Sequence, residues 1–92
     1  MDARKIIHAK EIWQDGTIVE MVVWVLGHPV PGSSHPFKYR LYCGRAGQCI
    51  VRYDNERDKG DHKHYGNKET HYPFKSLEQL IQDFETDVRR LT

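Results

Sequence analysis

One segment of the sequence has the apolar spacing of an amphipathic α-helix, and it constrains the fold more than any other feature. Ser76, followed three residues later by Gln79, is typical of a helix N-terminus. The apolar residues that follow share one helical face: Leu77, Leu80, Ile81, Phe84, Val88 and Leu91. One helix with one apolar stripe cannot form a core alone, so the rest of the chain must supply a surface for it to cover.

The remaining patterns are those of β-strands joined by turns. Asp15-Gly16 is a strong hairpin signal between two segments rich in strand-forming residues. A loop is expected at residues 27–36, which hold three prolines and two glycines. Strands are expected at residues 4–13, 17–26, 37–43 and 48–53, with a short edge strand at 70–74.

These patterns predict an α+β fold: an antiparallel meander sheet of four to five strands with one C-terminal amphipathic helix packed on it. A chain of 92 residues supports one core, so we expect a single domain over residues 1–92. Glu20 is the only charged residue in TIVEMVVWVL, the second strand segment. We therefore expect the helix to cover one face of this strand, and a partner or a second copy in a homodimer to cover the other.

Composition excludes several classes of protein. No apolar run approaches the roughly 18 to 20 residues of a membrane span, and the first residues are too charged for a secretory signal. We therefore expect a soluble, cytoplasmic protein in which Cys43 and Cys49 are free thiols. Fourteen basic and thirteen acidic residues give a net charge of only +1, so nucleic-acid binding would have to depend on local clusters of charge.

The most unusual stretch is the polar segment from Asp54 to Glu69, for which the sequence predicts a loop. It contains Asp61-His62-Lys63-His64, with two imidazoles at positions i and i+2. In an extended chain both imidazoles would point to one side and Asp61 and Lys63 to the other.

Three interpretations of this segment remain open. It fits a solvated loop whose glycines permit turns. It also fits metal-independent RNA cleavage, because histidine, with an ordinary pKa of about 6.5, can take and give protons near neutral pH. The third interpretation is a metal site, since imidazole and carboxylate together suit zinc, manganese or iron; its ligands would be Asp54, Asp61, His62 and His64.

Nearly the whole chain resembles the TumE family, small prokaryotic proteins regarded as toxins of toxin–antitoxin pairs. The resemblance lies in GTIVEMVVWVL, PVPGSSHPFKYRL, VRYDNERDKGDHKHY and FKSLEQLIQDFETDV. Its most specific part is R-Y-D-N-E followed by K-G-D-H-x-H, together with Lys-Tyr-Arg on the third strand. The matching positions are Arg52, Tyr53, Asp54, Asn55, Glu56, Lys59, Gly60, Asp61, His62 and His64, with Lys38, Tyr39 and Arg40.

The resemblance implies a co-produced antitoxin, typically with a helix-turn-helix DNA-binding region, that neutralises the toxin by direct contact. Small toxins of similar build are often ribonucleases, which favours an endoribonuclease acting on RNA without metal or cofactor. Two alternatives are a non-catalytic module that binds RNA or the antitoxin, and a metal-dependent nuclease or nucleotidyltransferase.

The endoribonuclease hypothesis assigns a role to each residue of the site. His62 and His64 are the acid and the base, in unknown order, and Asp61 orients one imidazole. Arg52 and Lys59 hold the scissile phosphate. The residues expected to bind substrate are Lys38, Tyr39, Arg40, Tyr53, Asp54, Glu56 and Lys63.

Overall fold

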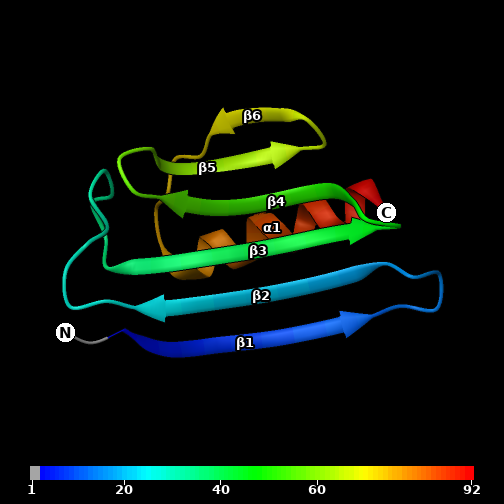
Figure 1. Cartoon of the computed structure of the whole chain (residues 1–92), viewed down its shortest axis with the longest axis horizontal. Helices are drawn as coiled ribbons and strands as arrows, with labels where there is room; N and C mark the ends of the chain where they lie inside the picture. The colour runs from blue at the N-terminus through cyan, green and yellow to red at the C-terminus, as the bar shows by residue number, and fades with distance from the viewer. Residues whose placement is uncertain (1–2) are drawn as a thin grey trace.

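A six-stranded antiparallel sheet forms most of the molecule in the computed structural model, which describes residues 3–92. Each strand pairs with the next one along the chain, so that sheet order equals chain order (Figure 1). The strands are β1 Arg4–Ile12, β2 Ile18–Val25, β3 Phe37–Arg45, β4 Gln48–Glu56, β5 Gly60–Tyr65 and β6 Lys68–His71. The predicted α+β class and the antiparallel sheet are confirmed, whereas the predicted count of four to five strands is wrong.

The extra strands come from the polar segment predicted to be a loop. β4 continues to Glu56, and β5 and β6 form a hairpin around Gly66, which has a φ of +58°. β5 has charged or imidazole side chains on both faces, so no apolar alternation marks it as a strand. The predicted strand at residues 70–74 ends at His71 instead, two residues before Pro73, which has no N–H to donate to a sheet ladder.

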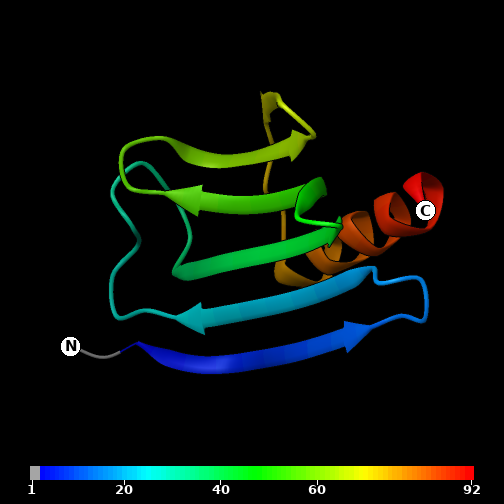
Figure 2. The same ribbon diagram turned by 45° about the vertical axis from the view of Figure 1, so that its right-hand side comes forward.

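The helix predicted from the C-terminal spacing is present as α1, Leu77–Leu91. Ser76 caps it, since its Oγ accepts a hydrogen bond from the Gln79 amide at 3.0 Å. α1 crosses one face of the sheet behind β3 and β4 (Figures 1 and 2). The core between helix and sheet consists of Val23, Tyr39, Leu41, Cys43, Val51, Tyr53, Tyr72, Leu80, Phe84 and Val88.

A buried carboxylate fastens the helix to the sheet. Asp87 accepts hydrogen bonds from the hydroxyls of Tyr53 and Tyr65 and, at 2.9 Å, from Arg90. Burial alone would raise the pKa of Asp87, but these three hydrogen bonds outweigh it and hold the pKa below its ordinary value. The Asp87 carboxylate is therefore charged at neutral pH and accepts all three hydrogen bonds.

The loop predicted at residues 27–36 is confirmed, and it packs against the turn between β4 and β5. The Asp58 amide donates to the Pro31 carbonyl at 2.6 Å. Gly32 and Gly60 meet there with φ of +95° and +71°. A Cβ added to Gly32 would lie 3.1 Å from the Asp58 Cα, so the contact requires a residue without a side chain.

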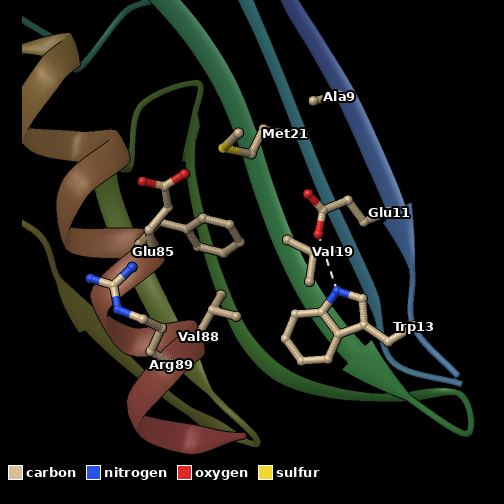
Figure 3. Close-up of a pocket in the computed structure, with 9 residues that line it drawn as sticks. Ala9, Glu11, Trp13, Val19, Met21, Glu85, Val88 and Arg89 are labelled. Atoms are coloured by element: carbon tan, nitrogen blue, oxygen red, sulfur yellow. Dashed lines mark hydrogen bonds between the residues drawn. The ribbon is translucent and has the colours of Figure 1, made fainter. Parts of the chain in front are cut away.

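α1 leaves a groove over the first hairpin, because it packs against β3 and β4 rather than β1 and β2. The groove has a volume of about 250 Å³. Figure 3 shows Glu85 and Arg89 of α1 facing Val19 and Met21 of β2 across it. The helix thus covers its face of β2 only in part, and the predicted homodimer stays a prediction.

Two smaller expectations concern the thiols and the membrane. Cys43 and Cys49 are both free, as predicted, and Cys43 is buried in the core. Within residues 3–92, no helix combines the length and the apolar character that a membrane crossing requires.

Candidate active site on the open sheet face

The face of the sheet opposite α1, here called the open face, carries two rows of polar side chains. Residues directly opposite each other in an antiparallel pair point to the same face, so the strand register defines each row. The first row runs from β3 to β6 as Arg40, Asp54, His62 and His71. The second runs alongside it as Tyr42, Arg52, His64 and Glu69.

Asp54, His62, His64 and Glu69 meet where these rows adjoin, and we call them the histidine cluster. Nε2 of His62 lies 2.7 Å from Oδ1 of Asp54 and 3.5 Å from Oε2 of Glu69. Nε2 of His64 lies 3.8 Å and 3.9 Å from the same two oxygens. The two imidazole rings are 5.0 Å apart between centroids. The expectation that both histidines share one side of an extended chain is therefore confirmed.

His62 is held with its Nε2 among carboxylates. Its side chain is only 4 % exposed, and Nδ1 lies 3.1 Å from the Gly60 carbonyl. A carbonyl oxygen only accepts, so Nδ1 carries a proton. Nε2 then faces Asp54, Glu69 and also Glu56 at 3.2 Å. The carboxylates therefore surround Nε2 with negative charge, which attracts a cation to it.

His64 has the opposite arrangement. Arg52 donates from Nη2 to Nε2 of His64 at 3.0 Å. Because a guanidinium has no lone pair to offer, Nε2 of His64 must be unprotonated. Burial and then the Arg52 charge lower the pKa of His64, in agreement with this geometry. The cluster thus pairs one imidazole whose Nε2 faces carboxylates with one whose Nε2 is unprotonated and accepts a hydrogen bond from Arg52.

Comparison with known proteins gives a family for the chain. The family model of Toxin TumE matches residues 2–92. The chain belongs to the TumE family. No curated protein and no solved structure matches it. As a TumE-family toxin, the chain is the toxin of a toxin–antitoxin system, and the family implies a cognate antitoxin as its partner.

The other basic residues of this TumE-family chain lie around the cluster at different distances. Arg52 also contacts Asp54, at 3.1 Å from Nε to Oδ2. Lys59 lies in the turn after β4, 3.2 Å from Glu69, and its hydrogen bond holds the pKa of Glu69 below the ordinary value. On β3, Arg40 is exposed on the open face, and Lys38 donates to the Asn55 carbonyl.

Four residues predicted for the TumE site lie on the helix side of the sheet, away from the cluster. Asp61 points to the helix side, where both its oxygens lie 3.0 Å from Nε2 of His35, so it orients that imidazole and neither His62 nor His64. Tyr39 and Tyr53 are buried in the core, with 0 % and 1 % exposure, which leaves no ring face for a base. Lys63 lies over the rings of Tyr53 and Tyr65 on the helix side.

Glu69 is a member of the cluster that the sequence reasoning missed. It lay in the segment predicted to be a loop, where nothing relates it to His62 and His64. Gly66-Asn67 is a two-residue hairpin signal, and it would have placed Glu69 on a strand opposite His64. His35 was also missed as the partner of Asp61, because no local pattern links residues 26 positions apart.

Proposed function

We propose that this TumE-family toxin is an endoribonuclease that cleaves RNA on the open face without a metal ion, with His64 as general base and His62 as general acid. The contrast between the two imidazoles carries the proposal. Nε2 of His64 is unprotonated and accepts from Arg52, while Nε2 of His62 is surrounded by carboxylates, which attract a proton. Two neighbouring groups in opposite protonation states are what acid–base catalysis requires.

The reaction follows from these states. Arg52 first turns from Nε2 of His64 to the phosphate, which frees the lone pair of that nitrogen. Nε2 of His64 then takes the proton of a ribose 2′-hydroxyl, and the 2′-oxygen attacks the adjacent phosphorus. The bond from phosphorus to the 5′-oxygen breaks, and that oxygen receives the proton from Nε2 of His62. The products are a 2′,3′-cyclic phosphate and a 5′-hydroxyl. After the reaction Nε2 of His64 carries a proton and Nε2 of His62 does not.

Cations around the cluster would stabilise the phosphorane. Arg52 and Lys59 border the cluster, and Lys38 and Arg40 extend the positive charge along β3. Glu56 and Glu69 lie between solvent and His62, with side chains 50 % and 38 % exposed. These two side chains have room to turn aside as a phosphate enters, and Lys59, which contacts both, would turn with them.

The test is cleavage of total cellular RNA by the purified protein, in EDTA and without it, with the new ends mapped. We compare the double variant His62→Ala/His64→Ala with the control His8→Ala. His8 lies on β1 of the same sheet, where its Nε2 is 3.6 Å from Oε2 of Glu20. We expect EDTA-resistant cleavage with 2′,3′-cyclic phosphate ends in the wild type and in His8→Ala, and none in the folded double variant.

Two results would overturn this mechanism. Equal cleavage by a folded double variant would remove the histidines from the chemistry. RNA retardation on gels without new ends, from wild type and double variant alike, would identify a binding module instead of an enzyme.

The biological setting is proposed on the same basis. We infer that the toxin acts in the cytoplasm and that its antitoxin carries a helix-turn-helix region. An antitoxin that masks the open face would protect His64 from modification by diethyl pyrocarbonate in the complex. Unchanged modification of His64 in the complex would place the antitoxin elsewhere.

A further inference from the structure

We propose that Asp54, His62, His64 and Glu69 form a binding site for one divalent first-row transition metal ion of the Zn²⁺ class. The site shares both imidazoles with the proposed active site, but it rests on their geometry and not on RNA cleavage. Two imidazoles with two carboxylates are a donor set that suits Zn²⁺, Co²⁺ or Mn²⁺.

The donor atoms already converge. Bonds from Zn²⁺ to nitrogen or oxygen are about 2.0 to 2.2 Å, so two donors on one ion can be at most about 4.4 Å apart. Nε2 of His62 and Nε2 of His64 lie between 2.7 and 3.9 Å from the oxygens of Asp54 and Glu69. One ion can therefore reach all four side chains after small side-chain rotations.

Two buried polar atoms of the cluster lack a hydrogen-bond partner in the described part of the chain, and a bound metal ion would supply one partner for both. Among residues 3–92, Nε2 of His62 and Oδ1 of Asp54 are buried without a hydrogen-bond partner. The two atoms lie 2.7 Å apart but lack the alignment of a hydrogen bond. Unpaired buried polar atoms are costly, and a cation that both can coordinate removes the cost.

The outer contacts of His62 are those of a metal ligand. Its Nδ1 donates to the Gly60 carbonyl at 3.1 Å, which leaves Nε2 to face the cluster. A metal-bound histidine commonly donates its other ring nitrogen to a carbonyl or a carboxylate in this way. The backbone at the first residue of β5 thus fixes the ring in the orientation that coordination needs.

Two cations compete for the same atoms. Arg52 would have to release Nε2 of His64 while keeping its contact with Oδ2 of Asp54, and Lys59 would have to release Glu69. An ion would also occupy both Nε2 atoms that the acid–base reaction uses. Metal binding and metal-independent cleavage therefore exclude each other, and Zn²⁺ should inhibit the nuclease.

Binding is measured by calorimetric titration of the full, metal-free chain with ZnCl₂, and by the visible absorption of the Co²⁺ complex. We expect one ion per chain. Affinity should fall by at least about tenfold in His62→Ala, in His64→Ala and in Glu69→Gln. His8→Ala and Cys49→Ser are the controls for adventitious histidine and thiol binding, and both should bind as the wild type does.

Circular dichroism establishes that each variant is folded. If a histidine variant unfolds, Glu69→Gln still tests the site, because it changes only a half-exposed side chain. Wild-type binding by folded His62→Ala and by Glu69→Gln would overturn the proposal, as would the absence of binding at millimolar Zn²⁺. Cys49→Ser binding at least tenfold more weakly than wild type would also overturn it.

RNA cleavage in the same samples separates the two proposals. Cleavage in EDTA that Zn²⁺ abolishes, together with one bound ion, supports both. One bound ion with cleavage only in its presence keeps the metal site and overturns the metal-independent mechanism. Cleavage in EDTA by a protein that binds no ion keeps the mechanism and overturns the metal site.

Discussion

Nε2 of His35 lies 3.0 Å from both carboxylate oxygens of Asp61, although 26 positions separate the two residues. Both side chains are buried, and the His35 ring stacks on Phe74 with centroids 3.7 Å apart. The contact joins the proline-rich loop to β5 on the helix side, directly behind His62. Asp61 therefore supports the site through the backbone of β5.

We expect His35→Ala to destabilise the protein by about 2 to 4 kcal/mol, because it leaves the buried Asp61 carboxylate without its partner. Urea unfolding followed by circular dichroism measures the change. His28→Ala, in the same loop but exposed, is the control and should stay within about 0.5 kcal/mol of the wild type. Equal stability of the two variants would show that the His35–Asp61 contact contributes nothing.

Asp87 should make the fold sensitive to acid. Its pKa is lowered in the folded chain, so its stabilising effect is complete above the ordinary pKa of 3.8 and is lost as pH falls through the folded value. We expect Asp87→Asn to cost about 1 to 3 kcal/mol at pH 7 and progressively less below pH 4. Urea midpoints at a series of pH values measure this, with the exposed Glu85→Gln as control. A deficit that does not shrink in acid would contradict the assignment.

Arg40 should contribute to RNA affinity through charge alone. It is exposed on the open face and makes no ion pair among the described residues. We expect Arg40→Ala to reduce the slope of log affinity against log salt by about 0.7 to 1. Fluorescence anisotropy with a single-stranded RNA, using the His62→Ala/His64→Ala background to prevent cleavage, measures the slope. Arg89→Ala on the helix side should leave the slope unchanged, and an equal loss there would remove the open face as the RNA-binding surface.

Gly32 should be far less tolerant of a side chain than Gly47. Both have positive φ, +95° and +77°, so alanine strains the backbone at either position. A Cβ at Gly32 also meets the Asp58 backbone at 3.1 Å, whereas a Cβ at Gly47 meets nothing within 4 Å. We expect Gly47→Ala to cost about 1 kcal/mol and Gly32→Ala about 1 to 3 kcal/mol more in urea unfolding. Equal losses of stability in the two variants would mean that the loop around Gly32 moves away from Asp58 at no cost in free energy.

Regular patterns made the helix and the first four strands predictable from sequence. Leu80, Phe84 and Val88 in the helical stripe and the alternating apolar residues of β3 lie on faces that are buried against each other. β5 gives no such signal, because Asp61 and Lys63 face the helix side while His62 and His64 face the open side. What holds β5 in the sheet is its pairing with two neighbouring strands, which a local pattern cannot report.

For the site, the sequence could predict only which side chains share a face of an extended strand, because side chains alternate between the two faces. Alternation placed His62 and His64 together and Asp61 apart from them, yet the expected role of Asp61 depended on contact with one of these histidines. Tyr39 and Tyr53 were chosen for their chemistry, but position on the helix side of the sheet decides their exposure. Side-chain chemistry suggested which residues matter, and strand register decided which of them meet.

The order of the strands in the sheet also bears on how the molecule folds. The histidine cluster comes entirely from β4, β5 and β6, which are consecutive in the chain and pair as two hairpins. Hairpins of this kind close over short sequence separations, so they form quickly. The His35–Asp61 contact and the packing of α1 on β3 connect distant parts of the chain, so we expect them to form later. A refolding chain should thus bring His62 and His64 beside Asp54 and Glu69 before it has a core to hold them there.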